Sequence, residues 1–194
     1  MINIPPNKKT IREIIEQIET QKVTLEYMST GFPQVDVWLD GGFFKKELVV
    51  LGGISGLGKS YLAGTLTYNI ARNGFKCAYF SLEISNEMIV SRLLGAIANI
   101  KPTHIRMGFL NPQQQIEKIK AKADLEILGD NIVFYDNLYT LKSIMDEIRR
   151  NKFDFIVVDF IQNLIVENKE KEYDRLSLAA LELQKLAKEV NATI

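Results

Sequence analysis

A glycine-rich segment at residues 53–60 holds the residue types best suited to bind a phosphate chain. It reads GISGLGKS and matches the pattern G-x-x-x-x-G-K-[ST] at every fixed position. The glycines allow a backbone path that turns successive N–H groups toward one anion at the start of a helix. Lys59 would reach the β- and γ-phosphates, and the Ser60 hydroxyl would ligate Mg²⁺. The motif predicts a nucleoside triphosphate site with these binding residues: Gly53, Ser55, Gly56, Leu57, Gly58, Lys59, Ser60 and Tyr61.

A second metal ligand is needed beside Ser60, and in such sites it is an acidic residue at the end of another buried strand. Asp159 follows the apolar run 155–158 and fits this role, which is that of a Walker B aspartate. Asp136 follows the apolar run 131–135 and is a weaker competitor. Asp154 precedes its strand, so we expect it to be exposed. The predicted metal ligands are therefore Ser60 and Asp159.

Hydrolysis of a triphosphate also needs a group that polarises the attacking water. Glu83 lies just past the apolar run 76–81, and parallel strands present their C-terminal ends to one ligand crevice. A carboxylate in that place can act as a general base. It can equally be an acid near the start of a helix expected at 86–99, where negative charge is favoured. The residues alone leave both interpretations open.

The elements that must position these residues alternate between apolar runs and helical stretches. Apolar runs occupy 47–51, 76–81, 131–135 and 155–158, and near-continuous runs of this kind are typical of parallel strands buried on both faces. The pattern predicts helices at 60–73, 86–99, 112–123, 141–150 and 175–190, with short helices or turns at 33–40 and 102–107. The sequence therefore predicts an α/β fold with a mostly parallel sheet and helices on both faces.

Residues 1–27 read as an N-terminal extension, and residues 28–194 as the α/β domain. Thr10 and Glu13 form a capping box for a helix. An apolar stripe follows at helical spacing, made of Ile11, Ile14, Ile15 and Ile18. This helix either lies on the core of its own domain or docks on a neighbouring subunit.

Composition restricts the remaining possibilities. The chain has 194 residues, with Lys+Arg 24 against Asp+Glu 24, which argues against a chain-wide basic coat for nucleic acid. Cys77 is the only cysteine, and His104 is the only histidine, so no internal disulfide and no multi-histidine metal site can form. No apolar run approaches the roughly 20 residues that span a bilayer. These features favour a soluble cytosolic, hence cytoplasmic, domain.

Several side chains outside these motifs have simpler interpretations. We expect Cys77 to be a buried strand residue, and we expect Trp38 and the Phe43–Phe44 pair to pack in the core. Arg92, on the helix after Glu83, is placed to reach DNA, a phosphate or a local acid, and the sequence does not choose among these.

The ordered motifs together resemble the RecA-type motor domain of DnaB-family replicative helicases, over about residues 28–194. The resemblance rests on 29–32, 39–43, 47–48, the phosphate loop, 80–83, Arg92, 105–108, 159–162 and 183–191. It implies an ATP-dependent DNA helicase motor, which couples Mg²⁺-ATP hydrolysis to translocation on single-stranded DNA within a hexameric ring. It further implies that Glu83 is the catalytic base, acting with Lys59, and that the isoleucine-striped helix is a linker that packs on the adjacent subunit.

Three departures from the family pattern limit what it implies. The family's N-terminal helical domain is absent, so partners that bind there are not implied, although other replication proteins remain possible partners. The segment 165–175 falls where such motors place a DNA-contacting loop, yet it holds three basic and four acidic residues. Lys169, Lys171 and Arg175 are candidate DNA contacts there, and a solvated polar loop is an equal alternative.

The third departure lies at the C-terminal end of the sequence. The chain stops at Ile194, where the family begins a strand that lies between the Walker A and Walker B strands. We therefore expect a fragment of a longer protein, with weak or no turnover by itself because the arginine that reaches a neighbour's γ-phosphate is missing. The competing functions are another RecA-like ATPase, such as a recombinase or a clock-type ATPase, and an accessory protein that binds a helicase ring without productive turnover.

Overall fold

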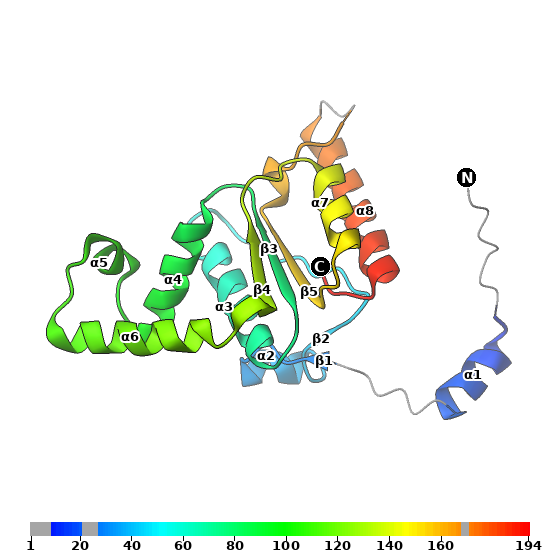
Figure 1. The fold of residues 1–194 in the computed structure, drawn as a ribbon. Helices are drawn as coiled ribbons and strands as arrows, with labels where there is room; N and C mark the ends of the chain where they lie inside the picture. Colours follow the sequence, from blue (N-terminus) through cyan, green and yellow to red (C-terminus); the bar gives the residue numbers. More distant parts are fainter. Residues whose placement is uncertain (1–8, 21–26, 168–170) are drawn as a thin grey trace.

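The computed structural model describes residues 9–20, 27–167 and 171–194 (Figure 1). The N-terminal elements are α1 (Ile11–Thr20), β1 (Tyr27–Met28), α2 (Pro33–Trp38), β2 (Phe43–Phe44) and α3 (Lys59–Arg72). The central elements are β3 (Cys77–Ser81), α4 (Asn86–Ala98), α5 (Pro102–Met107), α6 (Pro112–Glu126), η1 (Gly129–Asn131) and β4 (Ile132–Tyr135). The last elements are α7 (Leu141–Arg150), β5 (Phe155–Asp159), η2 (Ile161–Asn163) and α8 (Glu172–Val190).

The main sheet is parallel and has the strand order β4-β3-β5. The middle strand β3 pairs in register with both neighbours, so that Cys77 lies opposite Ile132 on one side and Phe155 on the other. At the other end of the strand Ser81 lies opposite Asp159. The carboxyl ends of β3 and β5 therefore meet at one edge, as the sequence predicted for the residues that follow them.

Helices cover both faces of this sheet, because β3 is apolar on both of its sides. Cys77 and Tyr79 belong to a buried cluster with residues of α3 and α4. Ala78 and Phe80 belong to a second cluster with residues of α7 and α8. Figure 1 shows α7 and α8 on one side of the strands and α3 and α4 on the other. The predicted α/β class is confirmed, and Cys77 is buried as expected, with the pKa of its thiol raised to about 12 by burial.

The strand predicted at 47–51 is wrong for this structure. The segment forms no strand, and Val50 is 79% exposed. Its contacts with the sheet run through the last residues of the chain, since Ile194 N–H donates to the Glu47 carbonyl (3.0 Å) and Val49 N–H donates to the Ile194 carbonyl (2.8 Å). A β-strand requires a hydrogen-bonded neighbour along its length, and this segment has one for only a few residues.

Residues 192–194 lie between this segment and β5. Thr193 N–H donates to the Asp154 carbonyl, and Ile156 N–H donates to the Thr193 carbonyl, both at 2.9 Å. The order across the sheet is therefore β4, β3, β5, residues 192–194 and residues 47–49. Next to Ile194 a cavity of about 270 Å³ opens between residues 48–53 and residues 155–162.

A hydrogen-bond cluster around Asp36 of α2 ties residues 29–36 together and to α3. The carboxylate of Asp36 accepts hydrogen bonds from the Ser29 hydroxyl (2.7 Å), the Thr30 N–H (2.8 Å) and the Thr30 hydroxyl (2.6 Å). Burial alone would raise the pKa of Asp36, but these hydrogen bonds from Thr30 and Ser29 outweigh it and hold the pKa below its usual range. The Asn69 side chain in turn donates to the Thr30 carbonyl (2.9 Å), which attaches this cluster to α3.

The predicted helices all form, with modest differences at their ends. The expected core position of Trp38 is wrong, because its side chain is 75% exposed at the end of α2. Phe43 is buried and stacks on Phe155 with ring centroids 5.7 Å apart, as expected. Among the described residues, no helix has the length and apolar character needed to cross a bilayer.

The capping box of α1 is confirmed. The Thr10 N–H and hydroxyl both donate to the Glu13 carboxylate (2.6 and 2.8 Å), and the Glu13 N–H donates back to the Thr10 hydroxyl (3.3 Å). Ile11, Ile14 and Ile15 are exposed, and α1 lies apart from the sheet in Figure 1. In this structure α1 therefore does not pack on its own core; the side chain of Ile18 lies outside the described set.

Candidate nucleotide-binding site

The phosphate loop runs from residue 53 into the first turn of α3. Gly56 and Gly58 have φ values of +83° and +87°, a region that non-glycine residues rarely adopt. Gly58 is the N-cap of α3, and no side chain of the described residues caps this helix end. The free N–H groups of the first turn and the positive end of the helix dipole are therefore available to an anion.

The Lys59 side chain folds into this loop. Its ammonium donates to the carbonyl oxygens of Gly53 (2.9 Å) and Ile54 (3.1 Å). The cation thus lies within the curve of the loop, where the motif requires it to meet a phosphate. Ser60 follows in the same turn of α3.

Asp159 ends β5 and is 8% exposed. Its Oδ2 accepts a hydrogen bond from the Tyr79 hydroxyl at 2.6 Å, and the same hydroxyl lies 3.5 Å from the Ser60 carbonyl oxygen. Burial, and then the negative charge of Asp159, raise the pKa of Tyr79 well above its usual range. The phenol therefore remains protonated and acts as a hydrogen-bond donor.

Glu83 lies just past the end of β3 and is exposed. The backbone beside it is tied to the end of β5, because the Leu82 N–H donates to the Asp159 carbonyl (2.7 Å). The Asn163 side chain also donates to the Leu82 carbonyl (3.2 Å). Within the described residues the Glu83 carboxylate has no hydrogen bond or ion pair of its own. The structure thus brings Glu83 and Asp159 to the same edge of the sheet.

The competing acids have structural partners. Asp136, after β4, accepts a hydrogen bond from the Asn86 N–H (3.0 Å) at the first residue of α4. This carboxylate therefore fills the helix-start role considered for Glu83. Asp154 lies at the opposite end of β5, where it accepts from the Lys76 N–H (2.9 Å) and pairs with Lys45 (3.0 Å).

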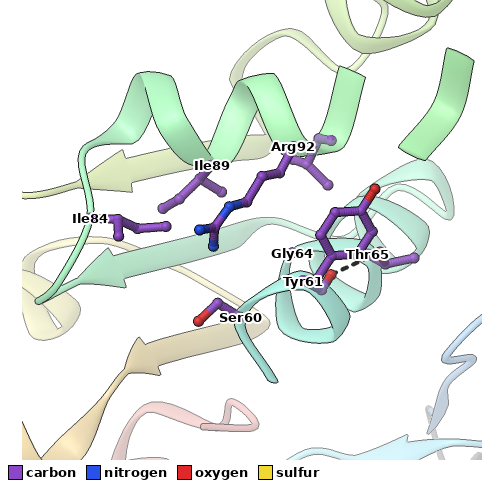
Figure 2. A pocket seen from close by; sticks show the side chains of 8 residues that line it. Ser60, Tyr61, Gly64, Thr65, Ile84, Ile89 and Arg92 are labelled. Atoms are coloured by element: carbon purple, nitrogen blue, oxygen red, sulfur yellow. Dashed lines mark hydrogen bonds between the residues drawn. The ribbon is translucent and has the colours of Figure 1, made fainter. Parts of the chain in front are cut away.

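Arg92 points into the site from α4. Figure 2 shows its side chain extending past Ile89 toward Ser60, at a small pocket between α3 and α4. The pocket encloses about 10 Å³, enough for one water molecule. Within the described residues the guanidinium has no hydrogen bond or ion pair, and its charge acts on the Tyr79 hydroxyl. No acid of the described residues pairs with Arg92, and contact with DNA or with a phosphate stays a prediction.

Two of the three candidate DNA contacts, Lys171 and Arg175, lie at the start of α8. Lys169 lies outside the described residues, and Lys171 is exposed immediately before α8. Arg175 is half-buried in the first turn of α8, and its Nε is buried without a hydrogen-bond partner among the described residues. These positions do not distinguish a DNA-contacting segment from a solvated loop, so both interpretations stay predictions.

The residues at the loop fit a magnesium ion. A serine hydroxyl and a carboxylate are oxygen ligands, and Mg²⁺ in nucleotide sites is held by one or two such groups together with the phosphates. No cluster of three or more His, Cys, Asp or Glu side chains is found in the described part of the chain. The donor set therefore suits a nucleotide-borne Mg²⁺ better than a metal ion caged by protein ligands alone.

Sequence reasoning missed Tyr79. The signal was a phenol in the middle of an otherwise apolar central strand, since a buried tyrosine hydroxyl usually finds a hydrogen-bond partner. The partner could not be identified from the sequence, because it is 80 residues away.

The parallel sheet, the glycine-rich loop at the start of α3 and the acid at the end of β5 define a P-loop NTPase with a RecA-like core. A family model described as the DnaB-like helicase C terminal domain matches residues 28–194. The chain belongs to this family, which confirms the resemblance inferred from its motifs.

Curated relatives agree with this assignment. The chain is 29% identical over 195 residues to the replicative DNA helicase DnaB of Treponema pallidum, covering 96% of this chain and 44% of the relative. It is 26% identical over 192 residues to the DnaB of Geobacillus stearothermophilus, covering 93% and 41%. The chain thus spans less than half of the length of these relatives.

Solved structures share the fold. One of them, an ATPase domain, superposes with a TM-score of 0.78 at 19% identity, covering 93% of this chain and 66% of that one. A second structure, described as a DnaB-like replicative helicase and its interactions with primase, superposes with a TM-score of 0.79 at 18% identity. The match covers 97% of this chain and 48% of that one.

Proposed function

We propose that this domain is the ATP-hydrolysing motor of a DnaB-type replicative helicase. The observation that carries the proposal is the convergence of the phosphate loop, Asp159 and Glu83 at one edge of the sheet. The backbone hydrogen bond from Leu82 to Asp159 holds the two acid-bearing ends together. Family membership over residues 28–194 supports the same assignment.

In this proposal the phosphates of ATP lie on the N–H groups at the start of α3, with the Lys59 ammonium at the β- and γ-phosphates. The supporting residues of the loop are Gly53, Ser55, Gly56, Leu57, Gly58, Ser60 and Tyr61. The Ser60 hydroxyl and the Asp159 carboxylate hold Mg²⁺, which when bound neutralises charge on the phosphate oxygens. Arg92 supplies a further positive charge from α4 toward the phosphate chain.

Glu83 is the proposed general base. Its carboxylate is exposed and unpaired within the described residues, so it is free to accept a proton from the attacking water. Asp136 already serves the start of α4, so the chain does not need Glu83 as a capping group.

The ring assembly, the DNA track and the location are parts of the same proposal. The exposed isoleucines of α1 favour docking on an adjacent subunit, as in a hexameric ring. Translocation on single-stranded DNA rests on the family alone, with Lys169, Lys171 and Arg175 as candidate contacts. Other replication proteins are further candidate partners. A cytoplasmic location fits the single buried thiol, Cys77.

The test is ATP binding and hydrolysis by this chain and two variants, with and without single-stranded DNA. Lys59→Ala should weaken Mg²⁺-ATP binding at least tenfold, since the phosphate charge loses its partner. Glu83→Gln should leave binding within about threefold and reduce whatever hydrolysis the chain shows by on the order of 100-fold, the range for loss of a general base. Single-stranded DNA should increase the wild-type rate.

Two outcomes would contradict the proposal. Absence of ATP binding by the folded wild-type chain would remove the nucleotide site. A large loss of nucleotide affinity in Glu83→Gln would show that this carboxylate is structural. Displacement of a strand from a forked duplex separates a helicase from other RecA-like ATPases and from an accessory protein without turnover.

A further inference from the structure

We propose that Tyr79 is a positioning residue for the magnesium site, holding the Asp159 carboxylate in place relative to Ser60. This inference rests on the proposed nucleotide site and adds a residue that belongs to neither the phosphate loop nor the acidic strand end. Tyr79 lies on the central strand β3, next to β5 in the sheet.

The Tyr79 hydroxyl lies close to both residues of the proposed metal site, at the carboxylate of Asp159 and at the backbone of Ser60. It donates to Asp159 Oδ2 at 2.6 Å, a short distance typical of a hydrogen bond to an ionised oxygen. It also lies 3.5 Å from the carbonyl oxygen of Ser60, in the first turn of α3. A single hydroxyl thus lies beside the end of β5 and the start of α3, the two elements that must supply the metal's protein ligands.

The position of this hydroxyl is fixed by packing. The Tyr79 side chain is 0% exposed and belongs to the cluster between the sheet and helices α3 and α4. Its ring contacts the Phe134 ring at a centroid distance of 5.9 Å. A donor held this way restricts rotation of the carboxylate, because Oδ2 accepts its hydrogen bond.

Within the described residues, Tyr79 is the only side-chain donor that contacts the Asp159 carboxylate. Removing the hydroxyl therefore leaves a nearly buried carboxylate without the partner that orients it. Loss of such a supporting hydrogen bond typically lowers metal affinity 10- to 100-fold, while the ligands themselves are intact. The proposal concerns the metal and leaves the phosphate loop unchanged.

The experiment compares Tyr79→Phe with Tyr135→Phe. Tyr135, on the neighbouring strand β4, is a matched control. Its hydroxyl also donates to a carboxylate, that of Glu147 on α7, at 3.0 Å. ATP affinity is measured by calorimetry in EDTA and across a MgCl₂ series. In Tyr79→Phe we expect ATP affinity in EDTA to stay within twofold of wild type. The Mg²⁺ concentration for half-maximal enhancement of binding should rise about tenfold. Tyr135→Phe should leave both quantities unchanged.

A double-mutant comparison separates positioning from general damage. In an Asp159→Asn background, Tyr79→Phe should cause no further loss of ATP affinity at any Mg²⁺ concentration, because its target carboxylate is already gone, whereas general damage to the site would lower the affinity again. If Tyr79→Phe does not fold, as judged by circular dichroism, Tyr79→Leu takes its place, since it also lacks the hydroxyl and retains an apolar side chain.

The outcomes distinguish this inference from the proposed function. An unchanged Mg²⁺ dependence in Tyr79→Phe, beside a Mg²⁺-dependent wild type, would overturn the positioning role and leave the nucleotide site standing. An equal loss of ATP affinity with and without Mg²⁺ would also overturn it, because it would show a purely structural effect. A folded wild type without ATP binding would remove the nucleotide site itself.

Discussion

Replacing Asp36 by alanine should destabilise the domain strongly, although Asp36 lies outside the nucleotide site. Its carboxylate accepts three hydrogen bonds, from the Ser29 hydroxyl and from both the N–H and the hydroxyl of Thr30. Thr30 is 0% exposed, so its N–H would lose its partner inside the protein, and its hydroxyl would keep only the Phe32 carbonyl at 3.4 Å. The Asn69 side chain, which donates to the Thr30 carbonyl, carries the disturbance into α3.

The magnitude follows from these contacts. A hydrogen bond to a charged group contributes about 1.5–3 kcal/mol, and leaving a buried donor unsatisfied costs about 1–3 kcal/mol. The three bonds share one acceptor group that is half-buried, so their contributions do not add fully. We expect Asp36→Ala to lower the free energy of unfolding by about 3 kcal/mol.

Urea unfolding followed by circular dichroism measures this loss directly. Asp124→Ala is the matched control, because Asp124 is exposed on α6, and it should change the free energy of unfolding by less than about 0.5 kcal/mol. A loss below about 1 kcal/mol in Asp36→Ala would refute the reasoning, since it would mean that water replaces the carboxylate without cost.

The stabilisation should also depend on pH in a defined direction. The native pKa of Asp36 is lowered, so the unfolded chain takes up its proton first as the pH falls. Its contribution is therefore fully present above the ordinary carboxyl pKa of about 3.9, and it is lost as the pH falls through the lower native pKa. The difference between wild type and Asp36→Ala should be constant from about pH 7 to about pH 5 and shrink below about pH 4.

Two further predictions concern the site and the assembly. Asp159→Asn should remove the Mg²⁺ dependence of ATP binding measured by calorimetry. Asp136→Ala is the control and should keep that dependence. It should lower the free energy of unfolding by about 1 kcal/mol, because it removes the partner of the Asn86 N–H at the start of α4. Equal Mg²⁺ responses in the two variants would contradict the assignment of Asp159. Replacing both Ile14 and Ile15 by glutamate should leave the fold intact and abolish ring formation in sedimentation velocity, and rings of unchanged mass would exclude α1 as the docking element.

The phosphate loop and the helices could be predicted because their signals are local. The glycine and lysine spacing of 53–60 sets the loop, and apolar periodicity sets helices such as α7, whose bounds agree with the prediction. The capping box at Thr10 likewise involves residues within a single helical turn. Such features depend on residues that are neighbours in the sequence, so the sequence alone is enough to predict them.

The wrong predictions and the open alternatives concern features that depend on contacts between residues far apart in the sequence. The apolar run 47–51 has strand composition, but a strand needs a hydrogen-bonded neighbour, and the neighbour is found only at residues 192–194. Trp38 is exposed because α2 presents its end away from the clusters that fill the core. The role of Asp136 at α4 depends on the order of strands in the sheet. The partner of Tyr79 depends on the same order, so neither could be read from the sequence.

Helix α8 connects the segment 165–175 with residues 192–194, which lie beside β5 in the sheet. Its first turn holds Arg175, next to the segment expected to meet DNA, and residues 192–194 follow its last turn. Those residues lie between residues 46–49, which precede the phosphate loop, and the start of β5, with hydrogen bonds to both. A helix of 19 residues is a stiff rod about 28 Å long. A displacement of α8 along its axis would therefore be passed through residues 192–194 to the segment that precedes the phosphate loop and to the first residues of β5.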